Sequence, residues 1–144
     1  MPDAPNTPLL MFIAHRSAES RVIDAVRAAG FDDLTLAQCR LAQRLSPEGS
    51  RLTDLAEQAQ ITKQTAGALV DELERAGYVS RKPDPADARA RLVTLSRRGM
   101  QLCAAAAGEV GQIEAEWRKH IGAKAYDNMR AALIALRDIT DPYR

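Results

Sequence analysis

A chain of 144 residues with 46% hydrophobic and 27% charged side chains has the size and composition of a single globular domain. This composition excludes disordered and fibrous proteins, and the length makes a two-lobed enzyme unexpected. The formal net charge is +1, yet residues 63–98 carry eight basic and five acidic side chains. A positive segment on a nearly neutral protein is typical of a chain that presents one face to a polyanion.

The first eight residues lack the basic region and cleavage site of a secretory signal. No apolar run approaches the roughly 20 residues that span a bilayer. We therefore expect a cytoplasmic protein without membrane contact. Cys39 and Cys103 form no short metal-binding motif, so we expect free thiols and neither a metal nor a cofactor.

Helix start and stop signals occur in the first third of the chain. Thr7 as an N-cap and Pro8 in the first turn predict a helix over 8–30 that Gly30 ends. Thr35 and Gln38 have the spacing of a capping box, which predicts a second helix to about Leu45.

Two short helices are expected next. Thr53 followed by Asp54 predicts the start of one. Thr62 predicts the cap of the other, which runs to Ala76 with Gly77 as its terminator. Apolar residues at three- to four-residue spacing give this second helix one buried stripe, formed by Ala66, Leu69, Val70 and Leu73.

The β-prone runs 78–82 and 91–95 flank a stretch rich in Pro, Asp and Ala, which predicts a hairpin with a long tip. Ser96 predicts the cap of a long helix that Gly122 ends, and a last helix closes at Asp141. The expected fold class is therefore mainly α with one small β-hairpin.

Two short helices joined by a tight turn, the second with a free polar face, are typical of a helix-turn-helix. The first turn of the second helix reaches base edges in the major groove of DNA, and Lys63, Gln64 and Thr65 occupy that turn here. The polar face predicts binding to double-stranded DNA.

The hairpin that follows is basic, with Arg81, Lys82, Arg89 and Arg91. A flexible basic tip suits the narrow minor groove, where negative potential is concentrated. Asp87, two residues before Arg89, would aim the guanidinium through a bidentate pair.

Several segments resemble the MarR (multiple antibiotic resistance regulator) family of winged helix-turn-helix transcription regulators. They are Leu52-Thr53-Asp54-Leu55-Ala56, the helix between 61 and 77, Asp84-Pro85-Ala86-Asp87-Ala88-Arg89, and Leu95-Ser96-Arg97-Arg98-Gly99. The combination of an Asp-x-Arg wing with a Leu-Ser-x-x-Gly helix start is more specific than either piece.

The resemblance implies one MarR-like domain over 1–144, with dimerisation helices at 8–30 and 97–140 around a DNA-binding region at 35–96. It implies a homodimer on a palindromic operator with half-sites about 10 bp apart. The expected function is repression that a small aromatic or anionic effector relieves. The expected DNA-binding residues are Thr53, Thr62, Lys63, Gln64, Thr65, Ala68, Arg81, Asp87, Arg89 and Arg91.

Two positions depart from the family pattern. Ala68 stands where many relatives carry arginine, so one base contact is missing or replaced by an apolar contact with a thymine methyl. Gln60 stands where a turn glycine is common, which would hold a side chain at positive φ at a cost of about 1 kcal/mol.

Residues outside the DNA-binding region keep more than one interpretation. His15 and Arg16 are candidate anchors for an anionic effector, or they have a surface or dimer-interface role. Cys39 is a buried hydrophobe or an effector and redox sensor. Trp117 and Tyr126 belong to helix packing or line a cavity.

Two other functions compete with DNA binding. The first is an enzyme. The sequence has no P-loop, HExxH or GxSxG motif, so we expect no catalytic residue. The second is a winged-helix protein-interaction or antirepressor module without DNA binding, which Ala68 keeps open.

Overall fold

The computed structural model describes residues 3–143, beginning with a short segment that leads into helix α1, Thr7–Ala28. The side-chain oxygen of Asn6 caps α1 by accepting a 2.9 Å hydrogen bond from the Leu9 N–H. The prediction that Thr7 is the cap was therefore wrong by one residue. Asn is as good a cap as Thr, and Pro8 is tolerated in the first turn because its missing N–H has no partner there.

Helix α2, Leu36–Ala42, has the predicted capping box. The Thr35 N–H donates to Gln38 Oε1 at 2.9 Å, and the Gln38 N–H donates to Thr35 Oγ1 at 3.2 Å. The helix ends before the predicted Leu45 because Gln43 already forms its C-cap.

Helix α3, Leu52–Ala59, begins after Arg51, which makes no side-chain cap. The expected start at Thr53 was wrong: Thr53 is the second helical residue. Ser50 and Val93 exchange backbone hydrogen bonds of 3.0 and 2.8 Å. This bridge holds the chain extended up to Arg51, so the helix starts directly after it.

The turn between α3 and helix α4, Lys63–Arg75, has the predicted unusual residue. Gln60 adopts the left-handed conformation with φ 56° and ψ 44°. Thr62 caps α4 as predicted, since its Oγ1 accepts a 3.0 Å hydrogen bond from the Thr65 N–H. Gly77 follows with φ 86°.

Strands β1, Val79–Asp84, and β2, Asp87–Leu95, form an antiparallel hairpin. Pairing runs from Val79 opposite Leu95 to Asp84 opposite Asp87. The prediction of a long tip was wrong, because the strands reach almost to the turn. One reason lies in local hydrogen bonding: an Asp84 carboxylate oxygen accepts a 2.8 Å bond from the Ala86 N–H and fixes the turn.

Helix α5, Arg97–Ile121, is capped by Ser96 as predicted. Gly122, at φ 92°, separates it from helix α6, Ala123–Thr140.

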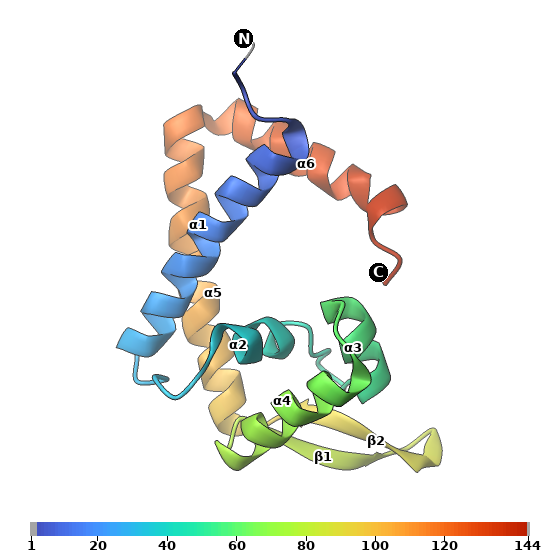
Figure 1. Cartoon of the computed structure of the whole chain (residues 1–144). Helices are drawn as coiled ribbons and strands as arrows, with labels where there is room; N and C mark the ends of the chain where they lie inside the picture. Colours follow the sequence, from blue (N-terminus) through green and yellow to red (C-terminus); the bar gives the residue numbers. More distant parts are fainter. Residues whose placement is uncertain (1–2, 144) are drawn as a thin grey trace.

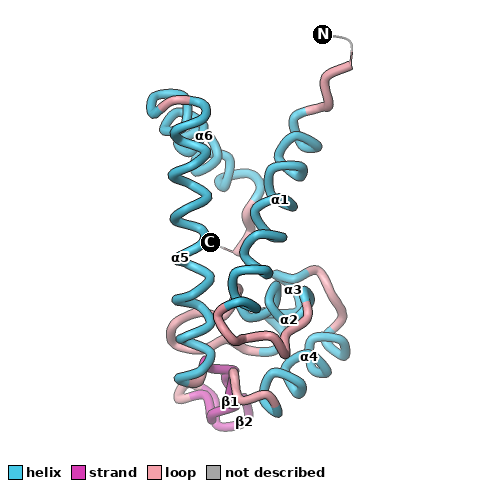
Figure 2. Tube along the Cα trace, turned by 90° about the vertical axis from the view of Figure 1, so that its left-hand side faces the viewer, coloured by secondary structure: helices cyan, strands magenta, loops and turns pink. Residues whose placement is uncertain are grey.

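The helices form two regions (Figure 1). α1 packs along α5, and α6 turns away from the far end of α5. α2, α3, α4 and the hairpin gather at the other end, and the view in Figure 2 shows the same division. Within residues 3–143, no helix is long and apolar enough to cross a membrane.

One apolar core joins the two regions. It takes side chains from α1, the α1–α2 loop, α2, α3, α4, the hairpin and α5: Val26, Leu34, Leu41, Leu55, Val70, Leu73, Tyr78, Val79, Val93 and Leu102. The predicted stripe of α4 is buried except for Leu69, which is partly buried against this core. Burial of one face of α4 leaves the opposite face exposed.

Candidate nucleic-acid interface and ligand cavity

The exposed N-terminal turn of α4 is the first part of the candidate nucleic-acid interface. Lys63, Gln64, Thr65 and Ala68 are all exposed. The Thr62 hydroxyl donates to Thr65 Oγ1 at 2.9 Å, which leaves the Thr65 hydroxyl proton free to meet an external acceptor. The free N–H groups at this helix start also favour a phosphate.

The hairpin provides the second part. Arg89 and Arg91 are exposed on β2, and the wing lies beside α4 in Figure 1. Asp87 Oδ1 accepts a 3.0 Å hydrogen bond from the backbone N–H of Arg89. The expected pair between Asp87 and the Arg89 guanidinium is not formed, so within the described chain the guanidinium is left for an external anion.

Arg81 has protein partners at the base of the wing. Its guanidinium donates to Asp71 at 2.7 Å and to Glu74 at 2.8 Å, and both acids belong to α4. Its side chain is only 20% exposed. The structure therefore gives Arg81 a bracing contact between β1 and α4, and its use on DNA would require that contact to open.

An ion pair also braces the wing turn. Arg51 Nη2 lies 2.7 Å from Asp84 Oδ2, and Asp84 is buried. The Ala86 N–H and the Arg51 guanidinium lower the pKa of the Asp84 carboxyl below its usual range. Thr53, expected at the interface, is exposed in the first turn of α3.

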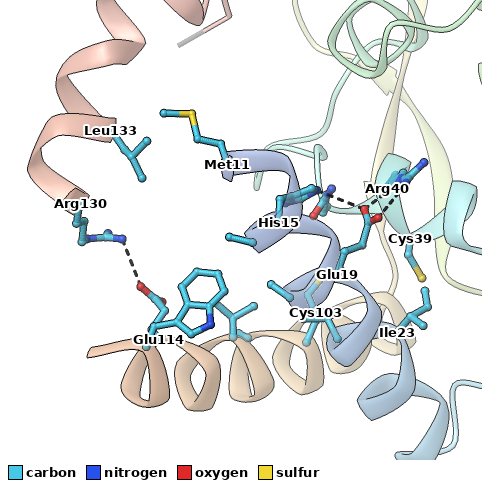
Figure 3. Close-up of a pocket in the computed structure, with 18 of the residues that line it drawn as sticks. Met11, His15, Glu19, Ile23, Cys39, Arg40, Cys103, Glu114, Arg130 and Leu133 are labelled. Atoms are coloured by element: carbon cyan, nitrogen blue, oxygen red, sulfur yellow. Dashed lines mark hydrogen bonds and ion pairs between the residues drawn. The ribbon is translucent and has the colours of Figure 1, made fainter. Parts of the chain in front are cut away.

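A second feature is a cavity of about 1070 Å³ lined by α1, α2, α5 and α6. Its walls are mostly apolar and include Trp117 and Tyr126. Figure 3 shows Leu133 of α6 on the cavity wall. Trp117 and Tyr126 therefore both line a cavity, and Tyr126 is also buried in the packing of α6 against α5, where it donates to Glu114.

Polar groups lie at two places in this cavity. His15 and Glu19 of α1 face Arg40 of α2, whereas Glu114 of α5 pairs with Arg130 of α6 at 3.4 Å (Figure 3). Glu19, Arg40 and Arg130 were not predicted as ligand-binding residues from the sequence. The four-residue spacing of His15 and Glu19 is visible in the sequence, but their contact with Arg40 is made only by folding.

The other effector candidates occupy different places. Cys39 lines the cavity together with Cys103. Burial raises the pKa of both thiols, and for Cys39 nearby Arg27 opposes that rise. A raised pKa disfavours the reactive thiolate. Arg16 does not line this cavity; its guanidinium lies 5.8 Å from the centre of the Phe12 ring.

The fold is that of a winged helix-turn-helix protein. It combines an exposed helix after a left-handed turn, a braced basic hairpin and long flanking helices. Comparison with known proteins shows what the chain is similar to. Residues 32–90 match the MarR family model. The transcriptional activatory protein BadR of Rhodopseudomonas palustris is 31% identical over 94 residues, which is 62% of this chain and 54% of BadR. The chain thus matches about half the length of that curated relative.

Solved structures agree over nearly the whole fold. The transcriptional regulator PA4135 is 25% identical with a TM-score of 0.71, covering 94% of this chain and 98% of its own. The Mycobacterium tuberculosis MarR family protein Rv2887, in complex with salicylic acid, is 25% identical with a TM-score of 0.67, covering 94% and 99%. Residues 32–90 are thus similar to the MarR family, and the chain has the fold of these transcription regulators.

Proposed function

We propose that this chain binds double-stranded DNA as a homodimer and regulates transcription from a palindromic operator. One observation carries the proposal: the first turn of α4 and Arg89 are both exposed in the same winged helix-turn-helix region, and the Arg89 guanidinium has no partner among residues 3–143. In this arrangement Lys63, Gln64 and Thr65 read bases in the major groove, Ala68 contacts a thymine methyl, and Arg89 enters the minor groove.

A second copy of the chain supplies the other half-site. Apolar side chains remain exposed on the first turns of α1 and along α6: Leu9, Leu10, Met11, Phe12, Met129, Leu133, Ile134 and Ile139. Five of them, Leu10, Met11, Met129, Leu133 and Ile134, also line the cavity, so the second copy would cover that side of it. An apolar surface of this extent is typical of a protein interface. We assign residues 8–30 and 97–140 to dimerisation and residues 35–96 to DNA binding.

We propose that the cavity binds the small-molecule effector that controls DNA binding. Apolar walls with arginines at two places suit a ligand with an apolar or aromatic body and an anionic group. Binding there would change the position of the DNA-binding region relative to α1 and α5, and release the operator. We propose repression by DNA occupancy, although BadR is named as an activatory protein.

A fluorescence anisotropy titration tests the proposal. The full chain is titrated against its own upstream DNA and a scrambled duplex at two salt concentrations. A regulator binds its own promoter more tightly by about three orders of magnitude or more and weakens steeply with salt. Equal, weak binding to both duplexes would contradict the proposal and favour a protein-interaction module. A reporter driven by the same promoter distinguishes repression from activation.

A further inference from the structure

The ion pair between Glu19 and Arg40 joins the two regions of the molecule at the wall of the cavity. Arg40 Nη2 and Nε lie 2.7 and 2.9 Å from the two carboxylate oxygens of Glu19, a bidentate arrangement. Glu19 belongs to α1 and Arg40 to α2. Both residues line the cavity, and Figure 3 shows them beside its apolar walls.

The pair is suited to exchange. The Arg40 side chain is 53% exposed, so an incoming anion can reach the guanidinium, whereas the Glu19 side chain is 15% exposed. His15 Nε2 lies 3.6 Å from Glu19 Oε2 on the preceding turn of α1. If Arg40 left Glu19, the His15 imidazole would remain beside that carboxylate, which lowers the cost of removing its arginine partner.

The other cavity pair is less suited to this role. Arg130 reaches Glu114 through one contact of 3.4 Å, and Tyr126 donates a 2.6 Å hydrogen bond to the same carboxylate. Both partners belong to α5 and α6. A ligand at Arg130 would therefore leave the link between α1 and α2 intact.

Helix α2, which carries Arg40, is also hydrogen-bonded to α4. Gln38 Nε2 donates a 2.7 Å hydrogen bond to Glu72 Oε2 of α4, and Gln38 is buried. Because α2 has only seven residues, Arg40 and Gln38 move together as one short rigid unit. Loss of the Glu19 contact would thus remove the polar link between α1 and α2 and leave the apolar core as the connection of α2 and α4 to α1.

We propose that a carboxylate ligand with an apolar body replaces Glu19 on the Arg40 guanidinium, and that this exchange breaks the ion pair that links α1 to α2. The inference rests on the proposed ligand-responsive function and names its specificity-determining residues. Arg40 is the ligand's charge partner, and Glu19 is the internal carboxylate that occupies its place.

Calorimetric titration of the full chain with 2-naphthoate and its uncharged amide, 2-naphthamide, tests the exchange. Glu19→Gln should bind naphthoate at least fivefold more tightly, because the competing carboxylate is gone. Arg40→Gln should bind it about tenfold more weakly or worse, as expected for a charged bidentate contact. Naphthamide affinity should change less than twofold in both variants.

Glu116→Gln is the matched control, since it removes a carboxylate from the Arg21 pair, which does not line the cavity. It should leave naphthoate affinity unchanged. Thermal melts by circular dichroism show whether each variant is folded, and Arg40→Lys gives a milder change if Arg40→Gln does not fold. Equal naphthoate affinities in the wild type, Glu19→Gln and the folded Arg40 variant would overturn the proposal, as would no binding to Glu19→Gln.

The titration contains no DNA, so it separates this inference from the proposed function. A wild-type chain that binds no promoter DNA contradicts the proposed function, while the exchange at Arg40 is still decided by the naphthoate affinities. Conversely, specific promoter binding with unaltered naphthoate affinities contradicts the exchange alone.

Discussion

Arg51 and Asp84 connect the start of α3 to the turn of the wing: Nη2 and Nε of the arginine lie 2.7 and 2.9 Å from the same carboxylate oxygen. Asp84 also accepts the Ala86 N–H that shapes the turn. This aspartate therefore fixes both the conformation of the wing turn and its position against α3. Because the wing is already held in place, less conformational entropy is lost when it binds DNA.

Asp84→Asn should lower thermal stability at neutral pH and weaken promoter binding. The folded-state pKa of Asp84 is lowered by its Ala86 and Arg51 contacts, so its contribution is present above the unfolded pKa of about 4 and is lost as pH falls through the folded value. Melting curves from pH 7 to pH 2.5 should show the wild type and the variant converging at the acid end. A difference in Tm that is constant over this range would contradict the assignment.

Gly99→Ala tests the junction between β1 and α5. A Cβ atom at Gly99 would lie 2.2 Å from the Tyr78 carbonyl oxygen, which is backbone and cannot move aside easily. We expect a loss of about 2–3 kcal/mol in the free energy of unfolding, measured in urea. Gly108→Ala is the control, because a Cβ there meets nothing within 4 Å and should stabilise α5 by about 0.5–1 kcal/mol. Equal effects of the two substitutions would refute the close approach.

Asp71→Asn tests the bracing contact of Arg81. The substitution removes one negative charge from the exposed side of α4 and leaves Arg81 paired with Glu74 alone. Binding to a non-specific duplex should strengthen about two- to fivefold, the range expected for one exposed charge. Asp127→Asn, which disturbs the Arg118 pair at the junction of α5 and α6, should leave DNA binding unchanged. Weaker binding by Asp71→Asn would mean that the brace matters more than the charge.

Local signals explain which parts of the fold the sequence predicted. The caps at Thr35, Thr62 and Ser96 and the left-handed Gln60 depend on hydrogen bonds or backbone geometry within a few residues, and all were confirmed. The starts of α1 and α3 were each displaced by one residue. For α3 the cause is the bridge between Ser50 and Val93, a long-range contact.

The residues of the candidate sites likewise fall into those that local sequence signals predicted and those that depend on long-range contacts. Exposure of the first turn of α4 followed from its apolar stripe, so Lys63, Gln64 and Thr65 could be proposed from the sequence. The pair of Glu19 and Arg40 could not, because the two residues are 21 positions apart in the sequence and lie on different helices. Arg81 illustrates the reverse case: a basic wing residue whose partners on α4 become visible only in the folded chain.

The salt dependence of promoter binding by Arg89→Ala tests the central claim most directly. If Arg89 neutralises a phosphate-rich groove, the variant should bind more weakly, and the slope of log K against log salt should decrease in magnitude by about 0.9. Lys124→Ala removes an exposed cation from α6 and should change neither quantity. An Arg89→Ala variant with the affinity and slope of the wild type would contradict the assignment of the wing to DNA.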